Sequence, residues 1–498
     1  MPFALSLISD IYRKGETCLD KKSLDQFFYA KSIAVVGASD DPQKAGYQIF
    51  HNLITQGYSG KAFPVNPGKN MIQGCLCFSS ILDIPGKLDL VVITIPAKGV
   101  LAVVDQMILR GDAHALVLIS AGFRETKTEE GAFMERTLVE KTQKAGIRVF
   151  GPNCTGVIIP ETHIDTTIEA GVEQRPGSIS IFSQSGAMAG SLLMIMADQP
   201  SPLGFSKYAH VGNMCDVDML DVLSYYGQDD STNVVCLYVE GCKDGREMIR
   251  RAAEVSKKKA VLALKVGRNE IGGKAAFSHT GSVAGKDEIY EAAFRKCGIT
   301  RVDSLFDMVD VAKAMSMQSL PRGNRICILT EAGGPGSMAM DELGQHPGLQ
   351  LAHISEEGRK KIKRLLPDMA MVCEPDGYID MSAAAMAPHH ADVLEAVLEE
   401  DGVDAVVFVT VPPNFLPPED IARAVIECGN KSGKPVISCF LAGKWVRNAR
   451  GMMEEAGWPT VNTSEQAVRV LTKMVERSEY LRSLPENVAI DDSEERNV

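Results

Sequence analysis

Short apolar runs recur along most of this 498-residue chain, and each ends in small or turn-forming residues before a helical pattern begins. The first run, residues 33–36, ends at Gly37, and the helical pattern after it continues through Leu53. Strands that alternate with helices in this way build a parallel sheet of the doubly wound kind. In such open sheets, ligands bind at the carboxyl ends of the strands. The turns after the apolar runs are therefore the candidate binding residues.

Three such units follow one another, so the sequence predicts an α/β protein of three consecutive Rossmann-like or flavodoxin-like parallel-sheet domains. The expected strands are residues 33–36, 61–65, 88–95, 115–119 and 148–150 in the first unit, 178–182, 234–239 and 260–266 in the second, and 326–329, 405–410 and 435–440 in the third. The predicted boundaries are an N-terminal extension over 1–27, domains over 28–150, 151–320 and 321–480, and an acidic tail over 481–498.

The turn after the first strand departs from a dinucleotide-binding turn, which reads G-x-G-x-x-G with an acidic residue about 20 positions further on. Gly37 is in place, but the next glycine is Gly46, and Asn66 ends the second strand where Asp or Glu would meet a ribose. These differences weaken an NAD-binding interpretation. A nucleotide-like phosphate at the helix start and a plain turn without any ligand both stay open.

The second unit has hydroxyl groups and a glycine where its first strand leads into a helix. Ser183, Gln184, Ser185 and Gly186 follow this strand, and the helix continues through Ala197. Hydroxyls and free backbone N–H groups at a helix start are what an anion site needs. One of the serines can equally serve only as the N-cap of the helix.

A single histidine, His279, lies among small residues in the segment 277–285, shortly after Gly272 and Gly273. Small neighbours let the backbone turn tightly and the imidazole protrude, and a neutral imidazole can accept a phosphoryl group and pass it on. Glu240 ends a strand that would neighbour the strand leading to His279, so its carboxylate could orient the ring. Taken alone, Glu240 fits a solvated surface acid as well.

The composition narrows the class of protein. The net charge of -12 argues against a nucleic-acid-binding surface, although not against an anion at a helix start. The 12 cysteines include no CxxC pair, so we expect reduced thiols in a cytoplasmic protein and no metal site. No stretch of about 18 uninterrupted apolar residues is present, so no membrane span is expected.

The order of these motifs resembles the α-subunit side of the NDP-forming acyl-CoA synthetases, which are the ADP-forming acetyl-CoA synthetases and relatives of succinyl-CoA synthetase. The resemblance covers about residues 28–475. In the third unit, Cys373-Glu374-Pro375-Asp376, with Asp380 nearby, stands where relatives usually carry Asn-Pro-x-Asp. The resemblance rests on Val36-Gly37-Ala38-Ser39, Pro64-Val65-Asn66-Pro67, Ile95-Pro96-Ala97, Ser120-Ala121-Gly122-Phe123, Gly151-Pro152-Asn153-Cys154, Ser183-Gln184-Ser185-Gly186, Glu240-Gly241, His279-Thr280-Gly281 and Gly333-Gly334-Pro335-Gly336.

This resemblance implies a first domain that binds CoA, a second that carries a phosphohistidine, and a third, ligase-like domain. It implies that His279 is phosphorylated and that Glu240 supports it. Gly212 and Asn213 would lie near the acyl group and the phosphate. The residues implied for the phosphate are Ser183, Gln184, Ser185 and Gly186, and those for CoA are Gly37, Ala38, Ser39, Lys44, Val65, Asn66, Pro67, Ile95, Pro96, Ala97 and Asn153.

By the same resemblance, the chain would be the α subunit of an enzyme that converts a carboxylic acid, ATP and CoA reversibly to acyl-CoA, ADP and phosphate. The reaction would pass through an acyl phosphate and a phosphohistidine. The family needs an ATP-grasp domain, and no such module is visible among these 498 residues. We therefore expect an ATP-grasp β subunit that carries ATP or ADP with Mg²⁺, and an α2β2 assembly. We expect no nucleic-acid or membrane partner.

Two other functions stay open at this stage. A non-catalytic CoA-binding or regulatory protein would have no need of both Glu240 and His279. An NAD(P)-dependent oxidoreductase would need the glycines and the acid that the first turn lacks. The choice of carboxylic acid, of ADP or GDP, and of the physiological direction is also left open.

Overall fold

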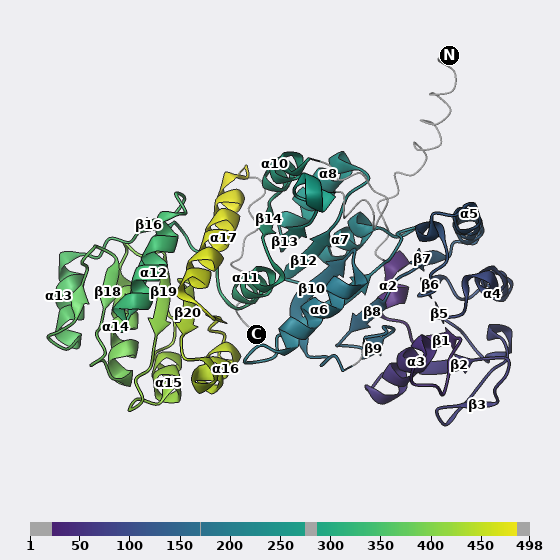
Figure 1. The fold of residues 1–498 in the computed structure, drawn as a ribbon, viewed down its shortest axis with the longest axis horizontal. Coiled ribbons are helices and arrows are strands. Elements are labelled where there is room, and N and C mark those ends of the chain that lie inside the picture. Colours follow the sequence, from purple (N-terminus) through teal and green to yellow (C-terminus); the bar gives the residue numbers. More distant parts are fainter. Residues whose placement is uncertain (1–21, 170, 274–285, 486–498) are drawn as a thin grey trace, which may run out of the picture. The chain divides into compact units, whose positions relative to one another are not determined.

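The computed structural model describes residues 22–169, 171–273 and 286–485 (Figure 1). These residues form two compact units. The first unit holds the described residues up to 169 together with residues 207–228, and the second holds residues 171–206 together with the described residues from 229 onward. Most of the predicted N-terminal extension and most of the predicted acidic tail fall outside the described residues.

The first unit is built on a five-stranded parallel sheet of order β2-β1-β5-β6-β7. All five strands predicted for this part of the chain are confirmed. The order of the strands reverses between β1 and β5, and this is the point where ligands bind in folds of this topology. The elements are β1 (Ser32–Val36), α3 (Ala45–Thr55), β2 (Lys61–Val65), a hairpin of β3 (Met71–Ile72) and β4 (Cys75–Leu76), β5 (Leu90–Ile93), α4 (Ala97–Arg110), β6 (Ala115–Leu118), α5 (Glu129–Lys144) and β7 (Arg148–Phe150).

The same unit contains antiparallel pairs that the sequence analysis did not predict. β8 pairs antiparallel with both β9 and β11. An aromatic cluster anchors α2, because Phe27 stacks on Phe150 with ring centroids 4.0 Å apart and Phe28 stacks on Tyr225 at 4.8 Å. The elements are α2 (Lys22–Phe28), β8 (Gly156–Ile159), β9 (Ile164–Asp165), β11 (Phe205–His210) and α7 (Met219–Gly227).

The second unit contains two further sheets, and the first of them has the parallel order β14-β13-β12-β10. Because β12 pairs with both β10 and β13, the carboxyl ends of these three strands lie side by side. All three predicted strands are confirmed. The elements are β10 (Pro176–Ser183), α6 (Gly186–Ala197), β12 (Val234–Val239), α8 (Gly245–Ser256), β13 (Ala260–Lys265), α10 (Asp287–Cys297), β14 (Ile299–Val302) and α11 (Leu305–Met317).

The other sheet of this unit has the order β17-β18-β15-β19-β20-β21, with β16 beside the start of β15. β17 runs antiparallel to β18, and the other pairs are parallel. Its three predicted strands are confirmed. The elements are β15 (Arg325–Thr330), α12 (Gly333–Gly344), β16 (Gln350–Leu351), α13 (Glu356–Leu365), β17 (Met371–Val372), β18 (Tyr378–Asp380), α14 (Ala387–Glu399), β19 (Ala405–Thr410), α15 (Pro418–Cys428), β20 (Val436–Phe440), the short helix η3 (Gly443–Val446), α16 (Arg447–Glu455) and β21 (Thr460–Val461).

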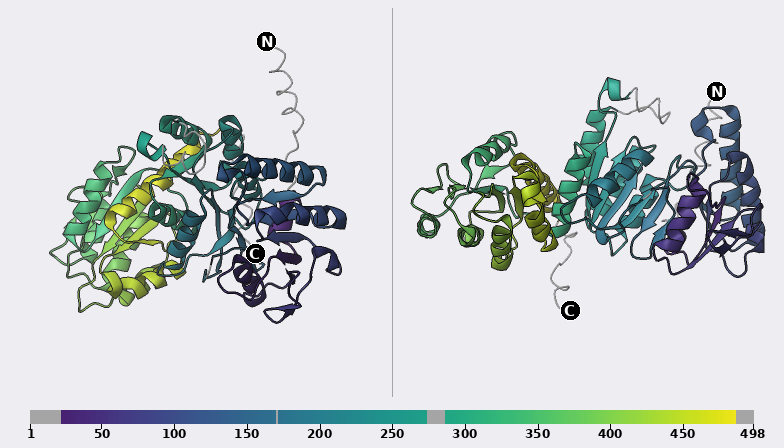
Figure 2. Two further views of the ribbon diagram at one scale, coloured as in Figure 1. Left: turned by 45° about the vertical axis from the view of Figure 1, so that its right-hand side comes forward. Right: turned by 60° about the horizontal axis from the view of Figure 1, so that its bottom comes forward.

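A long helix, α17 (Ser464–Ser483), ties the two sheets of the second unit together. It packs against β19 and β20 on one side and against α11 on the other, as Figures 1 and 2 show. Near its end, Arg477 donates to the carbonyl of Lys259 at 2.9 Å, and the Ser478 hydroxyl donates to the carbonyl of Pro321 at 2.6 Å.

The three parallel-dominated sheets confirm the predicted α/β class. The domain boundaries drawn from the sequence stay a prediction. In the part of the chain that the structure describes, no helix is long and apolar enough to cross a membrane. The cysteines within that part are free thiols.

Candidate functional site

The reversal point of the first sheet brings the turns after β1 and β5 together. Gly37 has a φ of 95°, and its N–H donates to the carbonyl of Val65 at 2.9 Å. A Cβ at Gly37 would lie 2.6 Å from Oγ1 of Thr94, so glycine alone fits this close approach. The Thr94 hydroxyl donates to the carbonyl of Val36 at 3.1 Å. The turn after β1 is therefore held tightly against the end of β5.

Asn66, which lies between Val65 and Pro67 at the end of β2, closes the same turn. Its Nδ2 donates to the carbonyl of Ala38 at 3.0 Å, and its Oδ1 accepts from the N–H of Gly68 at 3.0 Å. The Ser39 carbonyl accepts from the side-chain amide of Gln73 at 3.1 Å. An amide bound to the backbone thus stands where a dinucleotide-binding protein places an acid.

Two helices begin at this edge of the sheet. α3 follows Lys44, an exposed residue, and α4 begins at Ala97 with Pro96 as its N-cap. The first backbone N–H groups of a helix lack intrahelical partners and carry partial positive charge. Both helix starts can therefore receive an anionic group such as a phosphate.

Asn153 lies further along the same edge, after β7, and it is linked to the turn after β5. The Ser120 hydroxyl donates to the carbonyl of Ile95, and the Ser120 carbonyl accepts from the N–H of Asn153 at 3.0 Å. The residues that the sequence analysis assigned to CoA thus form a continuous row along the carboxyl edge of one sheet.

Asn213 was assigned above to the acyl and phosphate site. Its side-chain amide makes hydrogen bonds to two acidic side chains of the first unit. Its Nδ2 donates to Glu125 at 2.6 Å and to Glu135 at 2.9 Å. Burial raises the pKa of Glu125, but hydrogen bonds from Asn213 and from backbone N–H groups bring it below its ordinary value. At Gly212 a Cβ would lie 2.2 Å from the carbonyl oxygen of Pro152. Both positions are therefore constrained by packing, and a role at the acyl group stays a prediction.

The predicted phosphate residues of the second unit form a tight turn between β10 and α6. The buried Ser183 hydroxyl accepts from the N–H of Ser185 at 3.1 Å and donates to the carbonyl of Ser185 at 2.7 Å. Ser185 is the N-cap of α6, but its side chain makes no capping hydrogen bond. The N–H groups of the first turn, beginning at Gly186, are thus not capped by either serine hydroxyl.

Gln184 connects this turn to the end of β12. Its Oε1 accepts from the N–H of Glu240 at 2.5 Å and from the N–H of Gly241 at 3.0 Å, and its Nε2 donates to the carbonyl of Gly241 at 2.9 Å. Three hydrogen bonds from one amide therefore fix the backbone of Glu240 beside the start of α6. The structure brings Glu240 and the predicted phosphate turn together.

His279 lies outside the described residues, together with the rest of 274–285. The structure does place the strand that precedes it, because β13 pairs in parallel with β12 and sets Lys265 opposite Val239. Glu240 follows Val239 directly. The chain that leads to His279 therefore leaves the sheet from the strand next to Glu240.

Lys265 and Tyr290 are two residues at this edge that the sequence analysis missed. The Lys265 ammonium lies 4.6 Å from the centroid of the Tyr290 ring, and the Tyr290 hydroxyl accepts from the N–H of Cys242 at 3.0 Å. Burial lowers the pKa of Lys265, while Asp287 and Glu240 act in the opposite direction. A lysine at the end of an apolar strand is the signal that could have pointed to it.

The third sheet repeats the turn between β10 and α6, which the sequence analysis also did not predict. The Thr330 hydroxyl accepts from the N–H of Ala332 and donates to its carbonyl, both at 3.0 Å. Glu331 stands where Gln184 stands in the earlier turn, and its Oε1 accepts from Thr410 at 2.6 Å and Val411 at 2.5 Å, at the end of β19. The shared signal is a hydroxyl residue at a strand end with a glycine three positions later.

The segment Cys373-Glu374-Pro375-Asp376, singled out in the sequence analysis, forms the turn between β17 and β18. The Asp376 carboxylate pairs with His353 at 2.6 Å and with Arg359 at 2.9 Å. Burial raises its pKa, but these partners bring it below the ordinary value. Asp380, at the end of β18, lies instead beside the start of α12, where its Oδ2 would be 3.2 Å from a Cβ on Gly333. A carboxylate there is favoured by the helix dipole.

Two family models match parts of the chain that contain the predicted site residues. A CoA binding domain matches residues 31–160, which include the row of residues along the first sheet. A succinyl-CoA ligase like flavodoxin domain matches residues 176–315, which include the turn before α6 and Glu240.

Relatives match nearly the whole chain. It is 38% identical over 461 residues to the α subunit of ADP-forming acetate–CoA ligase II of Pyrococcus furiosus, covering 91% of this chain and 98% of that subunit. It is 35% identical over 474 residues to the ADP-forming acetate–CoA ligase of Methanocaldococcus jannaschii, covering 92% of this chain but 65% of that longer protein.

A solved structure has the same fold. The acetyl-coenzyme A synthetase 1 of Candidatus Korarchaeum cryptofilum, described as dinucleotide forming and solved with phosphate and ADP, superposes with a TM-score of 0.85. It is 31% identical, and the match covers 94% of this chain and 99% of that chain.

Proposed function

This chain belongs to the family of α subunits of ADP-forming acyl-CoA ligases, and we propose that it joins a small carboxylic acid to CoA through a phosphohistidine at His279. The overall reaction consumes ATP and CoA, forms acyl-CoA, ADP and phosphate, and is reversible. The observation that carries the proposal is the bridge made by Gln184, which holds Glu240 beside the uncapped start of α6.

CoA binds in the first unit, at the carboxyl edge of its sheet. Because Gly37 approaches Thr94 closely, the turn has no side chain at this position, where the order of the strands reverses. The starts of α3 and α4 favour phosphate groups there, and Lys44 adds a cation without a side-chain partner among the described residues. These features fit the phosphate-bearing part of CoA.

The phosphoryl group is carried on the imidazole of His279 in the second unit. In the direction of acyl-CoA formation, an imidazole nitrogen attacks the γ-phosphorus of ATP and ADP leaves. A carboxylate oxygen of the substrate then attacks the phosphorus, which frees the imidazole and forms an acyl phosphate. The CoA thiolate attacks the carbonyl carbon, and phosphate leaves. Glu240 orients the ring by accepting from the other nitrogen, and the N–H groups at the start of α6 hold the phosphoryl oxygens.

A β subunit of the ATP-grasp type supplies the nucleotide site and its Mg²⁺, in an α2β2 assembly. One support is the name of the Pyrococcus furiosus relative, which is itself an α subunit. The other is the Methanocaldococcus jannaschii relative, of which about one third lies beyond the match. That additional length is where a fused nucleotide-binding part would lie.

The test is labelling of the complex with γ-³²P-ATP, using His279→Ala and, as a matched control, His353→Ala on the surface of the third sheet. Wild type and His353→Ala should carry acid-labile, base-stable label on this chain and should form acyl-CoA. His279→Ala should lose both the label and the activity while it still binds CoA in calorimetry. Turnover of His279→Ala at the wild-type rate, or label confined to the β subunit, would refute the proposal.

A further inference from the structure

A pocket lies in the second unit, between the end of α6 and the start of α16. Its volume is about 630 Å³, within the range of small-molecule sites. It is lined from one side by the last turn of α6 and by α11, and from the other by η3, α16 and the residue after β21. We call it the α16 pocket.

The α16 pocket is separate from the predicted phosphate turn. Met194 and Ile195, in the last part of α6, line the pocket, whereas the turn lies before Gly186 at the opposite end of that helix. At 1.5 Å per residue, Met194 is about 12 Å along the helix axis from Gly186. The two sites are therefore at opposite ends of one helix.

Three cationic side chains, those of Lys444, Arg447 and Arg450, line the α16 pocket. Arg450 is half-buried, and it donates to the neutral oxygens of Thr460 at 2.9 Å and Asn462 at 2.7 Å. Burial lowers its pKa, while Glu454 and Asp310 act in the opposite direction. The Lys444 side chain is exposed and makes no hydrogen bond or ion pair with a described residue.

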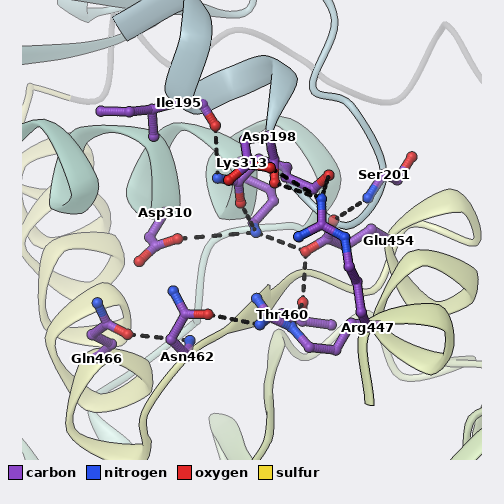
Figure 3. A network of polar contacts seen from close by, with 12 residues as sticks. Ile195, Asp198, Ser201, Asp310, Lys313, Arg447, Glu454, Thr460, Asn462 and Gln466 are labelled. Carbon is purple, nitrogen blue, oxygen red and sulfur yellow. Dashed lines mark hydrogen bonds and ion pairs between the residues drawn. The ribbon is translucent and has the colours of Figure 1, made fainter. Parts of the chain in front are cut away.

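The third cation, Arg447, is held by Asp198 at 3.2 Å in an exposed pair, which Figure 3 shows at one edge of a polar network. Asp310 also lines the pocket and is buried, 3.9 Å from Lys313. The lining therefore has three positive groups against two acids, in a chain whose net charge is -12. The local excess of positive charge favours an anionic ligand.

The same pocket has an apolar wall. Phe306, in the first turn of α11, and Met194 line it with side chains that are 58% and 42% exposed. Large apolar side chains that are exposed beside cationic groups fit a ligand that combines a flat apolar group with an anionic group.

We propose that the α16 pocket binds a nucleoside phosphate, with its phosphate groups between Lys444 and Arg450 and its base against Phe306 and Met194. The guanidinium of Arg450 suits a phosphate because its fork of N–H groups matches two oxygens, and charged hydrogen bonds are the strong ones. The ligand contacts η3 and α16, which follow a strand of one sheet, and α6 and α11, which follow strands of the other. It therefore lies between helices that belong to the two sheets of the second unit.

The experiment is calorimetric titration of the full chain with ADP, compared between wild type and variants of the α16 pocket, so that any ADP held at the CoA site of the first unit contributes equally to every titration. The variants are Lys444→Glu and Phe306→Ala, both at exposed positions where misfolding is not expected, with Lys360→Glu on the surface of α13 as the matched control. Inorganic pyrophosphate is titrated in parallel, because it has the anionic part without the base.

Wild type and Lys360→Glu should bind ADP equally, and Lys444→Glu should weaken binding about tenfold or more because a charged hydrogen bond is lost and a like charge is introduced. Phe306→Ala should weaken ADP and leave pyrophosphate unchanged. No binding of ADP to wild type, or equal binding to Lys444→Glu, overturns the site. Pyrophosphate binding as tightly as ADP overturns the nucleoside part and identifies a site for free phosphates. None of these outcomes bears on the labelling of His279.

Discussion

The imidazole Nε2 of His390 lies 3.4 Å from the carboxylate Oε2 of Glu331, and both side chains are buried. The other ring nitrogen, Nδ1, faces the carbonyl oxygen of Met386 at 3.0 Å, so Nδ1 must carry a proton. Oε1 of Glu331 already accepts from Thr410 and Val411. Nε2 and Oε2 have no other hydrogen-bond partner among the described residues, so a proton placed between them would satisfy both atoms.

A proton shared in this way predicts that two substitutions of Glu331 differ sharply. Glu331→Gln keeps an oxygen for Thr410 and Val411 and supplies an N–H toward His390, so it should cost at most about 1 kcal/mol. Glu331→Ala leaves three polar groups unpaired, two of them fully buried, and should cost about 3 kcal/mol or more. Urea unfolding of both variants and wild type measures the difference. Equal costs for Gln and Ala would contradict the shared proton.

The pair of Lys313 and Glu454 should behave as a unit. The two charges are 2.7 Å apart with no exposed surface, and the Glu454 carboxylate also accepts from Ser201 at 3.0 Å and Thr460 at 2.6 Å (Figure 3). Lys313→Met leaves a buried carboxylate without its cation and should cost about 3–5 kcal/mol. Combining it with Glu454→Gln should recover most of this loss in the same unfolding assay. A double variant as unstable as the sum of both single variants would contradict coupling.

Asp310 should make stability fall as pH rises. Burial raises its pKa from 3.8 to about 6, although Lys313 and Arg450 lower it, and Asp307 and Glu454 raise it further. The folded chain thus holds a proton that the unfolded chain releases between pH 4 and 6, so folding loses free energy as pH increases through this window. The full shift corresponds to about 3 kcal/mol.

Asp310→Asn removes this titration. Its unfolding free energy should exceed that of wild type by up to about 3 kcal/mol at pH 7.5 and by much less at pH 4.5. Urea unfolding at the two pH values is the measurement, and Glu288→Gln, at an exposed position of α10, is the control. A greater loss of stability at pH 7.5 than at pH 4.5 would show that the ion pair with Lys313 outweighs the burial of the carboxyl.

We expect substitution of Gln184 to slow the phosphorylation of His279 and to leave CoA binding unchanged. Gln184→Met has a similar length but removes the acceptor that holds the N–H groups of Glu240 and Gly241. We expect the rate of phosphorylation of His279 to fall by about tenfold or more, because the orienting carboxylate loses its position. The dissociation constant for CoA should stay the same. Rapid-quench labelling and calorimetry separate the two effects, and an unchanged labelling rate would remove Gln184 from the proposed site.

The parallel strands could be predicted from the sequence because a strand buried on both faces is a continuous apolar run. β12 and β19 are confirmed at their predicted bounds, residues 234–239 and 405–410. β11 was missed because Ser206, Lys207 and His210 interrupt its pattern, although all its residues are buried. Burial of these polar groups depends on partners from distant parts of the chain, such as Thr155, whose N–H donates to His210.

The candidate site could be predicted in part for a similar reason. Turns at strand ends are local, so the row from Gly37 to Asn153 could be placed along one edge from strand order alone. The bridge from Gln184 to Glu240 spans 56 residues, and the pair of Lys313 and Glu454 spans 141. No local pattern contains such pairings, because they depend on how the sheets and helices pack. The role of His279 stays a prediction from the sequence.

The buried pair of Lys313 and Glu454 also limits how this lineage can change. Substitution of either residue alone leaves the other as an unpaired buried charge, which lowers the stability of the protein before a second substitution can compensate. The two positions should therefore be inherited together, both kept or both exchanged for uncharged residues. Sequences of closely and distantly related chains would reveal this as covariation between two sites far apart in the gene.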